Sequence, residues 1–238
     1  MKRLAVLAMV LALAACKKDE PAPSQKIAKA ADTLIAKAAG ENPAIMLGQG
    51  TYAPRDECAT MPGAIEFRAQ LNKVVADRDI EGLIALVAND VRLNFGGGAG
   101  ANLLRSQLMQ SDRSLWDELD EMLALGCAKN GQGGITIPWY FDQDFGSIDP
   151  MVGMLVRGEN VPLMSAPDGD SDELRKLSWD VVELTDGFQP TAPFQKVKLP
   201  DRTVGYIETS SLRSLIAYRL IASSRNGKWS ITSLIAGD

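Results

Sequence analysis

The chain has 238 residues, of which 46% are hydrophobic and 23% charged, and its formal net charge is -5 at pH 7. This composition is typical of a globular protein with enough apolar residues for a core. The acidic balance argues against a nucleic-acid partner, because phosphate binding needs a basic face. The absence of histidine excludes Ser-His-Asp and Cys-His catalysis and the histidine-containing zinc sites of many hydrolases.

The chain begins with a pattern typical of an export signal. Two basic residues at positions 2–3 precede an apolar run over residues 4–15, which is too short for a spanning helix of about 20 residues. The stretch Leu13-Ala14-Ala15-Cys16 resembles the lipobox of bacterial lipoproteins. The resemblance implies cleavage before Cys16, acylation of Cys16 and a membrane as partner. The residue after this cysteine is Lys17 rather than an aspartate. In lipoproteins whose sorting avoids an aspartate there, this implies an address at the outer membrane, facing the periplasm.

Removal of residues 1–15 leaves 23 basic residues against 30 acidic ones, a formal charge of -7. It also leaves two cysteines besides the lipidated one, Cys58 and Cys127. An even pair in an oxidising compartment predicts a disulfide, and the alternative is two separate buried thiols. Such a bridge stabilises a domain by roughly 2–4 kcal/mol.

Residues 16–63 are expected to form a lipidated tether and linker. The first part, residues 17–25, is polar and contains prolines. Residues 26–39 place alanine, leucine and isoleucine at helical spacing, which predicts either a spacer helix or a helix lying on the membrane. Residues 41–63 are rich in glycine, proline and polar residues, so they are predicted to be linker.

Residues 64–153 are predicted to form a helix-rich α+β region. Apolar periodicity indicates a helix from residue 64, Asp79 is the predicted N-cap of a second helix, and residues 91–95 alternate as a strand. Two further helices are expected, over about 101–110 and 113–125. The last has an acidic face that we expect to be solvated; it carries Asp117, Glu118, Asp120 and Glu121.

The opening helix-helix-strand pattern over residues 64–95 resembles that of NTF2-like domains. This resemblance implies a cavity for a small molecule, so a carrier function is one alternative. The stretch 137–145 concentrates aromatics and carboxylates. Trp139 and Tyr140 are candidate ligand contacts, and the nearby aspartates allow a second alternative, a carboxylate enzyme acting on glycans. Burial of the large rings in a strand is the simpler interpretation.

Residues 154–213 show short strands separated by turn residues. They resemble bacterial SH3-like (SH3b) domains, and the matching residues are Val161-Pro162-Leu163, Ala166-Pro167, Leu177, Val181-Val182-Glu183, Phe194, Lys196-Val197, Gly205-Tyr206-Ile207 and Leu212. The resemblance implies a small β-barrel that recognises peptidoglycan or a protein partner. Trp179 and Tyr206 are its candidate ligand contacts, although Met164 stands where such domains commonly have arginine.

Residues 214–238 are predicted to form a β-hairpin around Asn226-Gly227, because both turn positions accept positive φ. This hairpin either follows the SH3-like barrel as a tail or pairs with the first region, in which case the barrel is an insertion. The pattern of residues leaves both arrangements open.

Together these patterns predict an α+β protein in which a helical region precedes or wraps around a small barrel. The predicted function is that of a lipid-anchored envelope protein acting as a binding or structural module for peptidoglycan or an envelope protein. The sequence predicts no enzyme activity, no catalytic residue, no cofactor and no metal site. The aspartates at 168, 170 and 172 lack the remaining ligands of a calcium loop.

Overall fold

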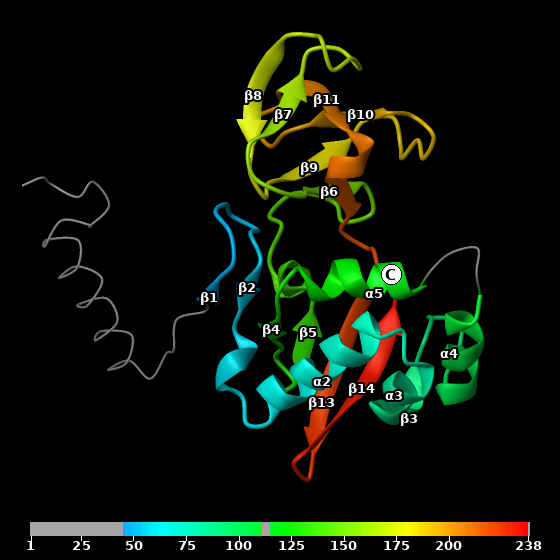
Figure 1. The fold of residues 1–238 in the computed structure, drawn as a ribbon. Helices are drawn as coiled ribbons and strands as arrows, with labels where there is room; N and C mark the ends of the chain where they lie inside the picture. The colour runs from blue at the N-terminus through cyan, green and yellow to red at the C-terminus, as the bar shows by residue number, and fades with distance from the viewer. Residues whose placement is uncertain (1–44, 111–114, 238) are drawn as a thin grey trace, which may run out of the picture. The chain divides into compact units, whose positions relative to one another are not determined.

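A computed structural model of the chain describes residues 45–110 and 115–237 (Figure 1). The fold is mixed α+β and mostly β, which confirms the predicted fold class. The predicted signal sequence, the lipidation site Cys16 and the expected helix 26–39 lie outside the described residues. Within the described ranges, no helix has both the length and the apolar character needed to cross a membrane.

The helical elements are short, and most of them precede the longest strands. They are η1 (Cys58–Thr60), α2 (Ala64–Ala76), α3 (Ile80–Ala85), α4 (Ala101–Leu108), α5 (Leu115–Leu123), η2 (Trp139–Asp142) and η3 (Thr209–Ser211). The strands are β1 (Ile45–Met46), β2 (Arg55–Asp56), β3 (Val87–Arg92), β4 (Ala128–Lys129), β5 (Ile135–Ile137), β6 (Gly153–Val156), β7 (Val161–Met164), β8 (Glu173–Leu177), β9 (Val181–Leu184), β10 (Phe194–Lys198), β11 (Val204–Glu208), β12 (Leu212–Ser214), β13 (Arg219–Arg225) and β14 (Lys228–Ile235).

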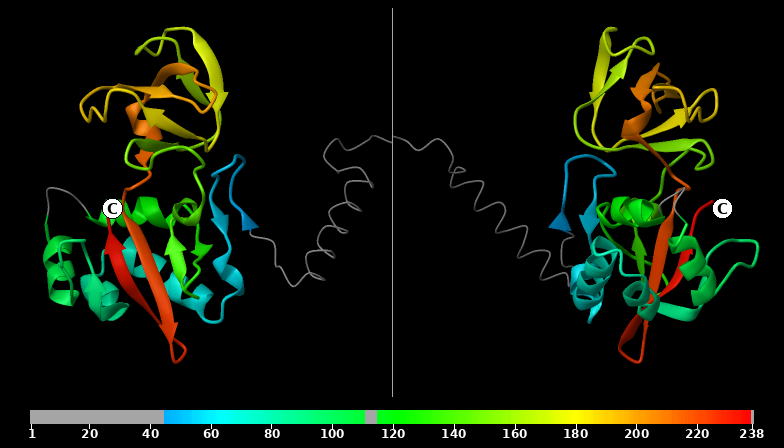
Figure 2. Two further views of the ribbon diagram at one scale, coloured as in Figure 1. Left: turned by 180° about the vertical axis from the view of Figure 1, so that it is seen from behind. Right: turned by 45° about the vertical axis from the view of Figure 1, so that its right-hand side comes forward.

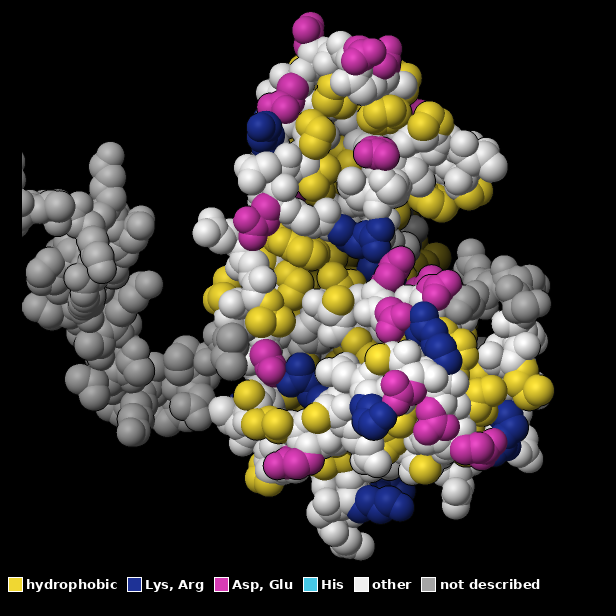
Figure 3. Space-filling model, viewed as in Figure 1, with side chains coloured by type: hydrophobic (Ala, Val, Ile, Leu, Met, Phe, Trp, Pro, Cys, Tyr) yellow, Lys and Arg dark blue, Asp and Glu magenta, His cyan; other side chains and the backbone are white. Residues whose placement is uncertain are grey.

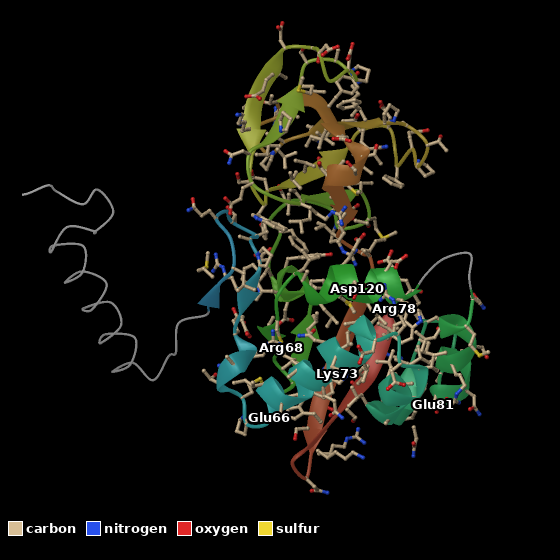
Figure 4. All side chains as sticks on the ribbon, viewed as in Figure 1. Glu66, Arg68, Lys73, Arg78, Glu81 and Asp120 are labelled. Carbon is tan, nitrogen blue, oxygen red and sulfur yellow. A yellow bond between two sulfur atoms is a disulfide. The ribbon has the colours of Figure 1, made fainter. Side chains whose placement is uncertain are left out.

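Helix α2 forms where the sequence predicts it, because its apolar residues cover one face. Phe67, Leu71 and Val75 of that face are buried in the core. From the flank of the helix, Arg68 (labelled in Figure 4) pairs with Asp56 of β2, with 2.7 Å between Nη1 and Oδ1. Helix α2 is therefore joined both to the core and to the strand that precedes it.

The turn between α2 and α3 is built around two neighbouring residues. Asp79 caps α3 as predicted, since its Oδ1 accepts a hydrogen bond from the backbone N–H of Gly82 at 2.9 Å. Arg78 has a positive φ of 53° and extends to α5, where it pairs with Asp120 at 2.6 Å and Asp117 at 3.1 Å (Figure 4). Half of the acidic face of α5 is thus paired with an arginine.

A five-stranded sheet has the order β3-β14-β13-β5-β4. The hairpin of β13 and β14 confirms the turn predicted at Asn226 and Gly227, whose φ values are 53° and 77°. Strand β14 also pairs with β3 in parallel, and β13 pairs with β5. The C-terminal hairpin therefore lies inside the sheet of the first region, between strands formed more than 80 residues earlier.

The chain leaves this sheet after β5 and returns to it at β13. These two strands are antiparallel neighbours, with Leu220 opposite Ile137. Strands β6 to β12 form between them and make a separate sheet, seen above the β13–β14 hairpin in both views of Figure 2. The strand pairing thus answers the question that the sequence left open, because the second sheet is inserted between two neighbouring strands of the first.

The seven-stranded sheet has the order β12-β6-β9-β10-β11-β7-β8. It has a core of its own, made by Met154, Val156, Val161, Leu163, Leu177, Val182, Val197, Leu199, Ile207 and Leu212. The order runs from one edge, β12, to the other, β8, without closing. The fold therefore has an open sheet over these residues, and the closed SH3-like barrel is not confirmed.

Cys58 and Cys127 form the predicted disulfide, with their Cα atoms 5.8 Å apart and a separation of 69 positions in sequence. The backbone N–H of Glu57 donates to the Cys127 carbonyl at 2.9 Å, and the Cys127 N–H donates to the Arg55 carbonyl at 2.8 Å. Residues 45–60 were expected to be linker, but they form β1, β2 and η1. The expectation was wrong here because the stabilising contacts come from residues far along the chain.

Two predicted strands have different bounds. The strand expected over 91–95 lies at Val87–Arg92, because the N–H of Leu93 turns to the Gly98 carbonyl at 2.9 Å and starts a turn. In the stretch 137–145, β5 ends at Ile137 and the 3-10 helix η2 follows. Three of the four aromatic residues of that stretch, Trp139, Tyr140 and Phe141, are therefore helical rather than extended.

Candidate functional site

The two sheets meet at an apolar group of residues, which we call the junction cluster. It consists of Leu125, Ala128, Trp139, Tyr140, Ile148, Leu155, Val181 and Leu215, with Tyr52, Phe141, Phe145 and Trp179 packed against it. These residues come from β4, β6, β9, η2 and the loops around them. Figure 3 shows hydrophobic side chains gathered on the face of the molecule where the two sheets meet.

Trp139 and Tyr140, two of the predicted ligand contacts, are the most buried aromatic residues of the junction cluster, with 3% and 1% of their surface exposed. The Trp139 indole N–H donates to Oε1 of Glu57 at 2.8 Å, and the guanidinium of Arg55 lies 4.6 Å from the indole centroid. The Tyr140 hydroxyl donates to the Ser214 carbonyl at 3.4 Å. Their polar atoms are satisfied inside the protein, so in this structure both rings contact protein.

A group of charged residues joins α5 to the seven-stranded sheet. Arg213 of β12 is 5% exposed, and its guanidinium donates to Glu121 at 3.1 Å and to Glu118 at 3.4 Å. Arg157, which follows β6, donates to Glu121 at 2.8 Å. Arg213 Nε also donates to the Tyr140 hydroxyl at 3.3 Å. The acidic face of α5, expected to be solvated, is therefore bound to arginines on both of its sides.

Beside the junction cluster lies a cleft of about 600 Å³, which we call the β8 cleft. Three parts of the chain line it: the loop between β1 and β2, the loop before β6, and the seven-stranded sheet. The lining residues are Thr51, Tyr52, Phe145, Gly146, Ser147, Ile148, Arg175, Lys176, Leu177, Asp180, Val181, Leu199, Pro200 and Asp201. Its volume lies within the range of about 300–1,000 Å³ that is usual for ligand sites.

Two aromatic rings stand together on one wall of the β8 cleft. The ring centroids of Tyr52 and Phe145 are 5.5 Å apart, with their planes tilted by 48°. The Tyr52 hydroxyl donates to the Asp144 carbonyl at 3.0 Å. Burial, followed by the charges of Asp144 and Asp180, raises the pKa of Tyr52, so this wall offers a neutral phenol and an apolar ring.

Other residues that line the β8 cleft carry charges. Arg175 donates to Oδ2 of Asp201 at 2.6 Å and to the Thr203 hydroxyl at 2.6 Å. The hydrogen bonds from Arg175 and Thr203 lower the pKa of Asp201 to about 2. Asp180 accepts from the Ser178 N–H at 2.9 Å. Among the residues that the structure describes, Lys176 pairs with no carboxylate, so it is the cation that the cleft presents to a ligand.

The groups that line the β8 cleft are suited to recognition of a ligand. The acid beside Arg175 is fixed in its ionised form at neutral pH, and a chain without histidine offers no imidazole base. Residues 45–110 and 115–237 include no group of three or more Cys, Asp or Glu side chains placed to hold a metal ion. Aromatic rings beside a cation match the polar and apolar contacts of a binding site.

The other two predicted contacts differ in their position. Trp179, with a φ of +52°, packs against the junction cluster, and its carbonyl accepts from the Tyr52 N–H at 3.0 Å. Tyr206 lies on β11, opposite Lys196 and Met164, and lines neither the junction cluster nor the β8 cleft. The fold thus brings together three of the four predicted contacts and leaves Tyr206 apart.

Two residues that line the β8 cleft, Tyr52 and Lys176, were not predicted from the sequence as site residues. Tyr52 stands in a stretch expected to be linker, and Lys176 had no distinguishing motif. The concentration of rings at 137–145 was the one available signal, since Phe145 belongs to it.

Comparison of the chain with models of protein families, with curated proteins and with solved structures found no match in any of the three. The geometry of the site must therefore carry the functional argument by itself.

Proposed function

We propose that this chain is a lipid-anchored protein of the bacterial envelope that binds a peptide-containing ligand, peptidoglycan or an envelope protein, in the β8 cleft. One observation carries the proposal: the rings of Tyr52 and Phe145 and the unpaired cation Lys176 line the same cleft. The lipobox-like residues before Cys16 support the envelope location.

The SH3-like architecture of residues 154–213 is part of this proposal. The residues that carry the resemblance lie on strands: Val161–Leu163 on β7, Phe194–Val197 on β10 and Gly205–Ile207 on β11. These strands are neighbours in the seven-stranded sheet. We interpret the open sheet as an SH3-like module. Its edge strand β8 lines the ligand site.

Co-sedimentation with purified peptidoglycan tests the proposal. The full-length chain, kept in mild detergent, is expected to sediment with the polymer. Tyr52→Ala and Phe145→Ala should weaken this binding about tenfold, because each removes one ring from the cleft. Tyr206→Ala is the matched control, since it removes a ring outside the cleft. Failure of the unaltered chain to sediment would make peptidoglycan the wrong ligand.

The lipid anchor has a test of its own. Cys16→Ser removes the sulfur that would carry the lipid, so the variant is expected in the soluble fraction after cell breakage. A variant that still fractionates with membranes would contradict the anchor.

A second candidate function, hydrolysis of glycans, has one observation in its favour. Burial, followed by the charge of Glu57, raises the pKa of Asp142, as a general acid requires. Turnover of labelled wall fragments that disappears in Asp142→Asn would favour this enzyme over a binding protein.

A further inference from the structure

We infer that an extended peptide binds in the β8 cleft by adding a strand to the free edge of β8, with an acidic side chain beside Lys176. The inference rests on the proposed function, because it names the class of ligand and the way in which the same cleft holds it. Three features of the structure support it: an unpaired edge, a cleft that includes this edge, and a free cation on it.

Strand β8 is an edge strand of the seven-stranded sheet and pairs with β7 alone. Lys176 stands opposite Pro162, which has no N–H to donate. In an antiparallel pair, alternate residues turn their N–H and C=O away from the partner strand, and proline fits at such positions. The N–H and C=O of Lys176 therefore point to the free edge, where the described residues provide no backbone partner.

The β8 cleft includes this edge, and it extends to Val181 of β9 and to the loop 199–201 between β10 and β11. Arg175, Lys176 and Leu177 all line it, although successive side chains of a strand point to opposite faces. A cleft that reaches three consecutive residues therefore gives access to the strand from its side as well as from one face. A peptide strand placed there would lie about 4.8 Å from β8 and would turn its own side chains toward Tyr52 and Phe145.

The other edge of the sheet is not available in this way. It is formed by β12, whose Arg213 is buried and bound to Glu118 and Glu121 of α5. Strand β8 has no such cover, and its residues Glu173 to Lys176 are exposed. Of the two edges, β8 is therefore the one that can accept another strand.

Charge complementarity defines the peptide. Arg175 is held by Asp201 at 2.6 Å, so Lys176 is the cation left to attract a ligand. A lysine on an edge strand also discourages pairing with unrelated strands, unless the incoming strand carries a compensating acid. We therefore assign the site to a peptide with an acidic residue flanked by apolar ones.

Synthetic peptides test the mode of binding on the full-length chain in detergent micelles. The parent probe is fluorescently labelled acetyl-Thr-Val-Asp-Val-Thr-amide, and its affinity is measured by anisotropy. A version with lysine in place of aspartate should bind at least tenfold more weakly. Two further versions are N-methylated, one at both valines and the other at the aspartate and the last threonine. Because only alternate amides face β8, one version should lose binding and the other should keep it.

Two variants of Lys176 separate its charge from its backbone. Lys176→Ala should weaken binding of the parent peptide three- to tenfold, while Lys176→Pro, which also removes the outward N–H, should abolish it. Melting temperatures of the two variants serve as the folding control. If the proline variant does not fold, the two N-methylated peptides still give the answer with the unaltered chain.

Each other outcome overturns the inference. Equal effects of the two N-methylations, or no binding of the parent peptide at millimolar concentration, would exclude strand addition. A dimer in sedimentation velocity that Lys176→Pro abolishes would make a second copy of the chain the occupant. In all these cases peptidoglycan sedimentation that depends on Tyr52 would leave the proposed function standing. Failure of the unaltered chain to sediment would separately reject peptidoglycan as its ligand.

Discussion

The two sheets of this protein differ in the length of their strands, in their covalent cross-linking and in the exposure of their edges. The five-stranded sheet includes the long strands β13 and β14, its core includes residues of α2, α3, α4 and α5, and the disulfide lies beside it. The seven-stranded sheet has strands of three to five residues, lacks cysteine altogether and exposes one edge. The stabilising features are therefore concentrated in the first sheet, whereas the open edge and the cleft belong to the second.

Loss of the disulfide is the largest expected effect and tests the first half of this comparison. The double variant Cys58→Ser with Cys127→Ser removes a cross-link between residues 69 positions apart. Chain entropy predicts a loss of about 4 kcal/mol, which corresponds to a fall in Tm of about 8–16 °C. Calorimetry measures it, and reduction of the unaltered chain should give a similar fall. An unchanged Tm would show that the bridge does not stabilise this region.

The junction between the sheets is tested by Arg213→Ala. The substitution leaves Glu118 and Glu121 without their buried partner, and because both carboxylates are partly exposed, we expect a loss of about 2–3 kcal/mol, below the usual range for fully buried pairs. Arg157→Ala is the matched control, since its more exposed pair with Glu121 should contribute less than about 1 kcal/mol. Urea titration measures both. Equal losses would mean that burial of Arg213 adds nothing.

The cap of α3 gives a smaller effect within the first region. Asp79→Ala removes the acceptor for the Gly82 N–H, so we expect a loss of about 1 kcal/mol and a fall in Tm of about 2–4 °C. Asp79→Asn keeps a capping oxygen and should stay near the unaltered Tm. If alanine and asparagine lower the Tm equally, the hydrogen bond does not contribute.

The smallest expected effect concerns Asp142, near the junction. Because its pKa is raised, mainly by burial and then by Glu57, the neutral form favours the folded state, and this contribution is lost as the pH rises through the raised pKa. Because Asp142 is exposed and solvent screens its charge, Asp142→Asn should raise the Tm only slightly at pH 7, by at most about 1 °C. Below pH of about 3.9 the two proteins should agree, since both side chains are then neutral. A Tm difference that does not change with pH would contradict this cause.

Local patterns in the sequence predicted local structure well. The helix from residue 64, the Asp79 cap and the Asn226–Gly227 hairpin are confirmed, because each depends on residues within one turn or one element. The disulfide was predictable from the cysteine count together with the expected export to an oxidising compartment. The order of the strands was not, since β14 pairs with β3 across more than 130 residues.

The candidate site was harder to predict for the same physical reason. Tyr52 reaches the cleft only because its backbone bonds to Trp179, 127 positions away. Trp139 and Tyr140 were selected as large rings, but a large ring in a sequence does not reveal whether it is buried or exposed. Lys176 acquires its importance from the free edge of β8, which is a property of the assembled sheet.

Hydrogen-deuterium exchange of the full-length chain, with and without solubilised peptidoglycan fragments, tests whether the ligand binds in the β8 cleft. We expect slower exchange at residues 174–177 of β8 and at residues 51–52 when the fragments are present, with no change in the paired strand β14. Unchanged exchange at β8 together with protection around Tyr206 would contradict this expectation, because the ligand would then bind the seven-stranded sheet away from the β8 cleft.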